Sequence, residues 1–266
     1  MKVMIIGAGN MGLTFGQSFI NASVIHREAL YFMDRSEAKA EAVRPLSTHP
    51  LSTEPSVIVA EMDLVILSVK PQDFPALAEP LRPYLRQDQL LVSIMAGLSV
   101  ASIQDRLHLP KVVRAMPNLP AQVGQGMTVF TTSEAVTRIE SYTVQNLLNT
   151  TGKTIFTETE ALLDSATAVS GSGPAYVFYY MSSMMEAARA MGFSEAEAQL
   201  LVRQTFLGAL QLLQRDQLTC EDWITRVASK GGTTEAALRS FDQDQLRQHI
   251  QAGMEAARLR AIDLSR

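Results

Sequence analysis

The stretch Val3-Met4-Ile5-Ile6-Gly7-Ala8-Gly9-Asn10-Met11-Gly12 joins a short apolar run to three closely spaced glycines. The apolar run predicts a buried strand, and the helical spacing of the apolar residues after it predicts a helix over residues 10–24. A glycine-rich turn between a strand and a helix lets the backbone approach a pyrophosphate, and the free N–H groups of the helix start attract it. The stretch therefore predicts a dinucleotide site formed by Gly7, Gly9, Asn10, Met11 and Gly12.

The residues after the next predicted strand, 30–33, bear on the type of dinucleotide. Asp34 ends this strand, about 20 residues after the glycines, as a dinucleotide site requires. A carboxylate there accepts a hydrogen bond from the ribose 2′-hydroxyl, which favours NAD, whereas Arg35 and Ser36 can pair with a 2′-phosphate, which favours NADP. The residues leave both open, and a solvated surface charge is the structural alternative for Arg35. We predict NADPH, with NADH as the alternative.

The first half of the chain alternates apolar runs with helical segments. The runs that predict strands are residues 3–6, 30–33, 57–59, 64–69, 90–94 and 112–116. Two added strands, 127–130 and 154–156, flank a helix predicted over residues 133–148, and an alanine-rich helix is predicted over 36–43. Short buried strands that alternate with helices indicate a mostly parallel sheet covered on both faces. We expect an α/β Rossmann domain over residues 1–157.

The second half predicts helices only, over residues 174–191, 194–214, 219–228, 234–240 and 243–262. The helix that begins at Pro174 is apolar nearly all round, whereas a surface helix carries a single apolar stripe. A domain of this size cannot bury such a helix on several sides, so we infer that a second subunit covers it. We expect an all-α dimerisation and substrate domain over residues 158–266, in a homodimer or a higher homo-oligomer.

Composition excludes several classes of protein. The 266 residues are 47% hydrophobic, which supplies a sizeable core, and the net charge of −4 gives no basic field for nucleic acid or an anionic membrane. The uncharged segment 166–185 is interrupted by Ser170-Gly171-Ser172-Gly173-Pro174, so we expect no membrane span. The single cysteine, Cys220, excludes an internal disulfide and is expected to be a semi-buried thiol. We expect a cytoplasmic protein.

Six stretches, in this order and spacing, carry a family resemblance over nearly the whole chain. They are Gly7-Ala8-Gly9-Asn10-Met11-Gly12, Val69-Lys70-Pro71-Gln72, Ser93-Ile94-Met95-Ala96-Gly97, Arg114-Ala115-Met116-Pro117-Asn118-Leu119-Pro120-Ala121, Ala168-Val169-Ser170-Gly171-Ser172-Gly173-Pro174-Ala175-Tyr176 and Gly231-Gly232-Thr233-Thr234. The set resembles the pyrroline-5-carboxylate reductase family. The resemblance implies an active site shared between subunits and hydride transfer to a cyclic imine. The product would be L-proline, in the last step of proline biosynthesis.

The segment Ser229-Lys230-Gly231-Gly232-Thr233-Thr234 precedes a predicted helix and suits a small imino acid. Its glycines let backbone N–H groups turn inward, and the helix start attracts an anion such as the substrate carboxylate. The Thr234 hydroxyl can donate to or accept from the ring nitrogen, and the resemblance places the matching threonine near that nitrogen. We predict substrate contacts from Ser229, Gly231, Gly232, Thr233 and Thr234, with Thr234 catalytic. An ordinary threonine helix cap is the alternative.

Further lining residues follow the ends of predicted strands, because ligands of open α/β sheets lie outside the carboxyl ends of the strands. The resemblance implies that Val69, Lys70 and Pro71, at the end of the fourth predicted strand, line the cofactor. Ala96 and Gly97 end the next strand, and Asn118 follows the sixth. We also predict that Ser170 and Ser172, in a second glycine-serine helix start, shape the pocket floor beside the nicotinamide. A helix entry that needs small residues for close packing is the alternative.

Other chemistries lack support in the residues. The four histidines lie outside these stretches, and no cluster has metal-ligand spacing, so we predict no metal site. A 3-hydroxyacid-type NAD(P) oxidoreductase would place a catalytic lysine on the long helix, where Arg189 is the only basic residue. The alternative that is not an enzyme is a catalytically silent NADP-binding sensor. Detectable turnover of pyrroline-5-carboxylate would exclude this alternative.

Three departures from the family pattern stand in the second half. Lys230 occupies the place of a usual proline, Ser182 that of a frequent glutamate, and the segment 218–227 with Trp223 is atypical. The positive charge of Lys230, next to the predicted carboxylate loop, can alter substrate preference.

Overall fold

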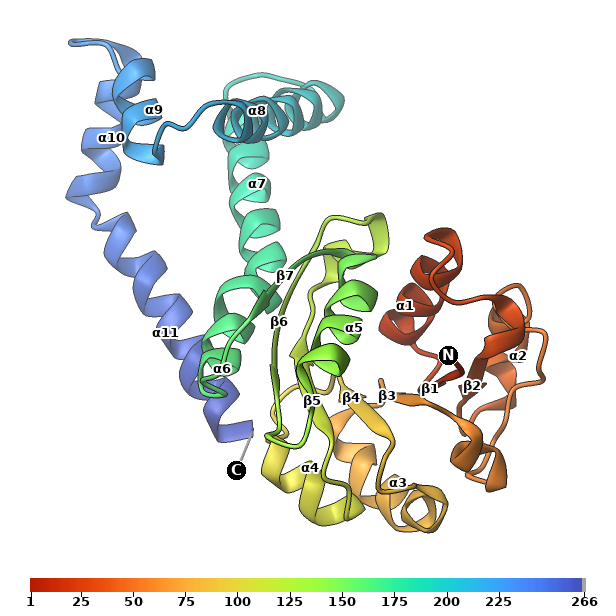
Figure 1. The fold of residues 1–266 in the computed structure, drawn as a ribbon. Helices are drawn as coiled ribbons and strands as arrows, with labels where there is room; N and C mark the ends of the chain where they lie inside the picture. The colour runs from red at the N-terminus through yellow and green to blue at the C-terminus, as the bar shows by residue number, and fades with distance from the viewer. Residues whose placement is uncertain (265–266) are drawn as a thin grey trace. The chain divides into compact units, whose positions relative to one another are not determined.

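The computed structural model describes residues 1–264 and contains a seven-stranded sheet with the order β2-β1-β3-β4-β5-β6-β7 (Figure 1). The strands are β1 (Val3–Ile6), β2 (Leu30–Met33), β3 (Leu64–Leu67), β4 (Leu90–Ser93), β5 (Val112–Met116), β6 (Gly126–Thr132) and β7 (Gly152–Phe156). All neighbours pair in parallel except β5 and β6, which are antiparallel. The predicted α/β class with a mostly parallel sheet is therefore confirmed.

Helices cover both faces of this sheet (Figure 1). One core cluster joins alternate strand residues such as Val3 and Ile5 to Phe15 of α1 (Asn10–Asn21) and to residues of α5 (Arg138–Asn149). The other joins Met4 and Ile6 to residues of α3 (Phe74–Leu81) and α4 (Val100–Leu107). Successive side chains of a strand point to opposite faces, so a continuous apolar run supplies both clusters.

One predicted strand and two predicted helices are corrected. Residues Val57–Glu61 form a 3₁₀ helix, because only Val59 of this segment is buried while Val57 is 75% exposed. The segment 36–43 forms a 3₁₀ turn followed by the single turn α2 (Ala40–Val43), and α1 ends at Asn21, before Ser23 takes a left-handed conformation. Lys70 and Asn118 therefore follow the third and fifth strands rather than the fourth and sixth.

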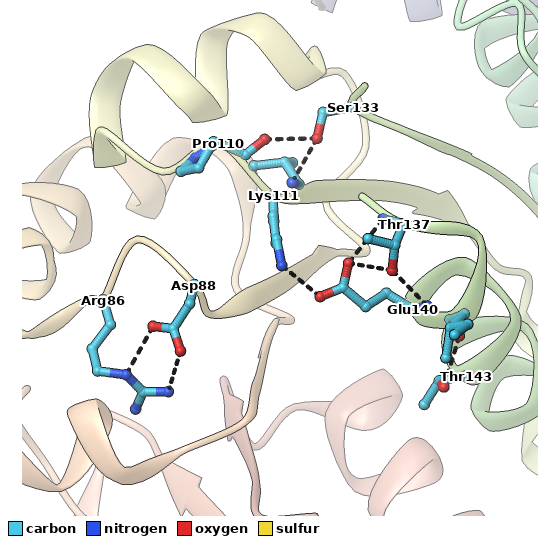
Figure 2. Close-up of polar contacts among 10 residues, drawn as sticks. Arg86, Asp88, Pro110, Lys111, Ser133, Thr137, Glu140 and Thr143 are labelled. Carbon is cyan, nitrogen blue, oxygen red and sulfur yellow. Dashed lines mark hydrogen bonds and ion pairs between the residues drawn. The ribbon is translucent and has the colours of Figure 1, made fainter. Parts of the chain in front are cut away.

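The start of α5 is fixed by a cluster of polar contacts (Figure 2). Thr137 and Glu140 form a reciprocal capping box, so the helix begins at Arg138, later than predicted. The Nζ of Lys111 lies 2.7 Å from Oε1 of Glu140. Burial raises the pKa of the Glu140 carboxyl, but the hydrogen bonds from Lys111 and Thr137 outweigh burial and hold this pKa below its usual value. The ion pair joins α5 to the residue that precedes β5.

A buried cation fastens the segment after β7 to the sheet. Arg114 on β5 is only 4% exposed, and its guanidinium lies 3.0 Å from Oε1 of Glu160 and 2.8 Å from Oδ1 of Asp164. Asp164 lies on α6 (Leu162–Ala166), which a π turn over Thr167–Gly171 continues. Pairing with two carboxylates compensates the desolvation of the guanidinium.

The contacts within the chain separate two compact units. Unit one holds Met1–Pro174 together with the described residues from Ala257 on, and unit two holds Ala175–Ala256. The helices after α6 are α7 (Gly173–Ala190), α8 (Glu195–Arg215), α9 (Cys220–Val227), α10 (Thr233–Gln243) and α11 (Leu246–Leu264). Up to residue 264 no strand follows β7, which confirms the helical second half.

The helices of unit two expose many apolar side chains in the single chain. On α7, the exposed fraction is 62% for Phe178 and 78% for Tyr179, and none of its residues is buried. Leu200 and Leu210 of α8 are likewise more than half exposed. Cys220 is exposed at the start of α9, so the expectation of a semi-buried thiol is wrong. No helix among residues 1–264 is both long and apolar enough to cross a membrane.

Candidate functional site

A cleft of about 1200 Å³ lies at the carboxyl ends of β1, β2 and β3. Seven of the predicted cofactor residues line it: Gly7, Gly9, Asp34, Arg35, Ser36, Val69 and Lys70. Residues from three strand ends thus come together, although they lie more than sixty positions apart in the sequence. This is the place at which open α/β sheets bind their ligands.

The glycine loop has the shape that a pyrophosphate needs. Gly7 has a φ of +105°, and a Cβ on it would lie 2.6 Å from the carbonyl oxygen of Ser68, while a Cβ on Gly12 would collide with the Gly7 carbonyl. A Cβ on Gly9, by contrast, meets no heavy atom within 4 Å, so the open space lies on the cleft side of the loop. Gly7 and Gly12 permit close packing, and Gly9 leaves room for the ligand.

The first turn of α1 offers its backbone rather than its side chains. Gly9 precedes the helix without a side-chain cap, and this turn holds no acidic residue. Among the described residues, the N–H groups of Asn10, Met11 and Gly12 donate to no partner, whereas Leu13 donates to the Gly9 carbonyl. Three unpaired N–H groups at the positive end of a helix fit a dinucleotide phosphate.

Asp34 connects the two loops that border the cleft. Its Oδ2 accepts a hydrogen bond from the N–H of Ala8 at 2.8 Å, and its Oδ1 accepts one from the N–H of Ser36 at 3.0 Å. The carboxylate therefore fixes the glycine loop against the loop after β2. Each carboxylate oxygen keeps a second lone pair, with which it can accept a ribose hydroxyl.

Three cations line the cleft, Arg35, Lys39 and Lys70, and the two on the segment after Asp34 differ in their pairing. The guanidinium of Arg35 lies 3.1 Å from the Asp73 carboxylate, and its side chain is 81% exposed. Lys39 is half-buried and lines the same cleft, and its ammonium forms no ion pair within residues 1–264. Lys39 was not among the residues predicted from the sequence, because a lysine in an alanine-rich helical segment is typical of a solvated surface.

The other predicted cofactor residues lie outside the cleft lining. Pro71 begins a 3₁₀ turn that carries Asp73, the partner of Arg35. Gly97 has a φ of +77° and packs closely on the end of α11, since a Cβ on it would lie 2.8 Å from the Leu264 carbonyl oxygen. Ala96 precedes it and is likewise absent from the lining. The amide of Asn118 donates to the Ser170 carbonyl at 3.0 Å and accepts from the N–H of Met127 at 2.8 Å.

The helix predicted after Ser170 and Ser172 is confirmed, since α7 begins at Gly173. The chain is already helical through α6 and the π turn, in which the N–H of Ser172 donates to the Thr167 carbonyl at 2.8 Å. The Ser170 hydroxyl donates to the Ala166 carbonyl at 3.0 Å. A Cβ on Gly171 would lie 2.8 Å from the Met116 methyl, so small residues serve close packing here. Substrate contacts from the two serines stay a prediction.

The five predicted substrate residues of unit two share one loop. Gly231 has a φ of +75°, and the N–H of Gly232 donates to the Ser229 carbonyl at 3.0 Å. Gly232 precedes α10 without a side-chain cap, and within the described chain the N–H groups of Thr233 and Thr234 donate to no partner. The carboxylate of Glu235, on the same turn, accepts the N–H of Gly231. The loop thus has free donors for an anion beside an anionic side chain of its own.

Comparisons with known proteins place the chain in a family. Residues 160–264 match the family model described as pyrroline-5-carboxylate reductase dimerisation, and residues 2–97 match the model described as NADP oxidoreductase coenzyme F420-dependent. The pyrroline-5-carboxylate reductase of Pseudomonas aeruginosa is 34% identical over 99% of this chain and 97% of its own length. That of Staphylococcus saprophyticus is 31% identical over 100% and 98%. This chain belongs to the pyrroline-5-carboxylate reductase family.

Solved structures of pyrroline-5-carboxylate reductases share the whole fold. The Coxiella burnetii protein superposes with a TM-score of 0.89 at 29% identity, over 100% of this chain and 98% of the other. The Plasmodium falciparum protein, solved with NADP bound, superposes with a TM-score of 0.87 at 26% identity over the same shares of the two chains. The family expected from the six stretches is confirmed.

Among residues 1–264 no group of three or more His, Cys, Asp or Glu side chains comes together in a way that could hold a metal ion.

Two glycine variants should separate packing from ligand binding in the cleft. Gly12→Ala forces a methyl group against the Gly7 carbonyl, so we expect a loss of about 1–3 kcal/mol of stability and a melting temperature lower by several degrees. Gly9→Ala fills only open space, so its melting temperature should stay near that of the wild type while binding of NADPH weakens. Circular dichroism melts and fluorescence titration with NADPH measure both. A destabilised Gly9→Ala variant that binds NADPH normally would contradict the assignment.

Proposed function

We propose that the protein reduces 1-pyrroline-5-carboxylate to L-proline with NADPH, the last step of proline biosynthesis. The observation that carries the proposal is the 34% identity to the Pseudomonas aeruginosa enzyme over 99% of the chain. This match includes both the glycine loop of the cleft and the segment from Ser229 to Thr234. The free N–H groups of these two helix starts suit the two anions of the reaction, the cofactor pyrophosphate and the substrate carboxylate.

In the proposed reaction, separate groups of residues bind the cofactor, the substrate carboxylate and the ring nitrogen. When bound, the reduced nicotinamide supplies the hydride that the imine carbon accepts. The first turn of α1 holds the pyrophosphate, while the N–H groups of Gly231 and Thr233 hold the substrate carboxylate and Gly232, whose N–H donates to the Ser229 carbonyl, shapes the turn between them. The Thr234 hydroxyl holds the ring nitrogen, whose proton stays on the product amine. Because the imine can enter already protonated, positioning is the main task of the protein.

For the cofactor, we propose NADPH over NADH, with the 2′-phosphate held by Ser36, Lys39 and Arg35. The Plasmodium falciparum protein was solved with NADP bound. Lys39 lines the cleft with a free ammonium, whereas Arg35 must exchange or share its carboxylate partner Asp73. A cation without a partner gains more from a phosphate than one already paired. We therefore assign the larger share of the recognition to Lys39.

We propose that the protein is a homodimer or a higher homo-oligomer in the cytoplasm, with domains over residues 1–157 and 158–266. The match to the dimerisation model begins at residue 160, close to the proposed boundary. The exposed apolar side chains of α7 and α8 support a covering subunit, because soluble monomers rarely expose large apolar patches. The net charge of −4 gives no reason to propose a nucleic-acid partner.

Turnover and the role of Thr234 are tested together. The wild type should oxidise NADPH when pyrroline-5-carboxylate is added. Thr234→Ala removes a hydrogen bond worth roughly 1–3 kcal/mol, so kcat/KM for the imine should fall about 5- to 150-fold while the Kd of NADPH stays unchanged. Thr234→Ser keeps the hydroxyl and should retain most of the activity. An unchanged kcat/KM in Thr234→Ala would remove this residue from the mechanism.

Cofactor recognition is tested by comparing Lys39→Ala with Arg35→Ala. Each variant loses a contact that only the 2′-phosphate makes, so KM for NADPH should rise several-fold and KM for NADH should barely change. The rise should be larger for Lys39→Ala. Steady-state kinetics with both cofactors measure these values, and equal effects on NADPH and NADH would show that neither residue reads the phosphate.

The oligomer is tested by multi-angle light scattering at micromolar concentration. Since one chain has a mass of 29.1 kDa, the measured mass should be at least twice this value. A monodisperse species with the mass of one chain would contradict the proposed covering of α7.

A further inference from the structure

Glu235 places a negative charge on the loop that is proposed to hold the substrate carboxylate. It occupies the third position of α10, and its Oε2 accepts the hydrogen bond from the N–H of Gly231. Gly231 is held in the left-handed region, with a φ of +75°. The other oxygen, Oε1, lies 3.7 Å from the guanidinium of Arg239, one helical turn further on. A carboxylate of the chain itself thus occupies one of the donors assigned to the ligand.

This arrangement differs from the acidic helix starts elsewhere in unit two. In α8 and α9 the third-position acids, Glu197 and Asp222, form capping boxes with Ser194 and Thr219. The hydrogen bonds of these boxes lower the pKa of both carboxyls. In α10 the capping residue is Gly232, which has no hydroxyl and donates its N–H to the Ser229 carbonyl. Glu235 therefore has no box to complete, and it reaches past the helix to Gly231.

We propose that Glu235 sets the affinity for the imino acid by competing with its carboxylate for the N–H of Gly231. The proposal rests on the proposed reaction. Two carboxylates cannot accept the same N–H, and their like charges repel at one helix end. The substrate enters when the Glu235 side chain leaves Gly231 and turns to Arg239, which keeps its charge paired. Glu235 is thus a specificity residue that weakens the binding of anionic ligands.

The experiment compares KM with kcat for pyrroline-5-carboxylate at saturating NADPH. Glu235→Ala frees the N–H and removes the charge, so KM should fall about 3- to 10-fold. Glu235→Gln keeps an acceptor without the charge and should show a smaller fall. In both variants kcat and the KM of NADPH should stay unchanged. Arg239→Ala removes the second partner of Glu235 and should raise KM. Glu197→Gln makes the same chemical change at the same position of α8 and is the matched control.

The outcomes separate this inference from the proposed function. A wild type without turnover contradicts the proposed function. Turnover in the wild type with an unchanged or higher KM in the Glu235 variants overturns the competition and leaves the function intact. A KM that falls equally in Glu197→Gln also overturns it, since the effect would then belong to net charge. If Glu235→Ala does not fold, as judged by circular dichroism, the fall in KM of Glu235→Gln decides.

Discussion

The hydrogen bond from the Ala8 N–H to the Asp34 carboxylate is the interaction on which the cleft depends. Parallel pairing brings the ends of β1 and β2 side by side, with Ile6 opposite Met33, and the N–H of Gly7 donates to the Met33 carbonyl. Asp34 then ties the next residue of the glycine loop to the loop after β2. With the loop fixed, the first turn of α1 keeps its N–H groups free at the positive end of the helix. A carboxylate expected to contact only the ribose is thus also a part of the scaffold.

Most strands of the first unit can be predicted from the sequence. A strand buried on both faces needs a continuous apolar run, and these runs are clearly separated along the chain. The strand predicted over residues 57–59 is wrong because tertiary packing buries only Val59 of this segment. The three consecutive apolar residues do not indicate which of them will be buried. The sequence does not single out Lys39, because the segment 36–43 has the composition of an ordinary alanine-rich helix. The structure shows that the first half of this segment is a 3₁₀ turn, Glu37–Lys39, that lines the cleft.

In the second half, the sequence predicts the start of a helix well where the capping contacts join residues that are close in the chain. Ser194 and Thr219 cap the helices that follow them, with an acid three residues on, as their sequence pattern indicates. The glycine-serine segment around Ser170 precedes α7 as predicted, but it needs small residues for a non-local reason. Gly171 is small because Met116 of β5 packs on it, and a π turn over Thr167–Gly171 precedes α7. No helix-start rule contains this contact, since its two partners lie far apart in the sequence.

The two helix starts that are proposed to bind anions differ in whether they carry an acidic residue. The first turn of α1 contains no acid, so nothing within that turn opposes the cofactor phosphates, whereas α10 carries Glu235 on its first turn. Substrate, transition state and product of the proposed reaction all carry the same carboxylate. Tight binding of that group lowers the free energy of all three alike and does not speed the chemical step. An internal carboxylate that weakens this uniform binding would therefore leave the chemical step unchanged and shorten the residence of L-proline, without an effect on cofactor binding at α1.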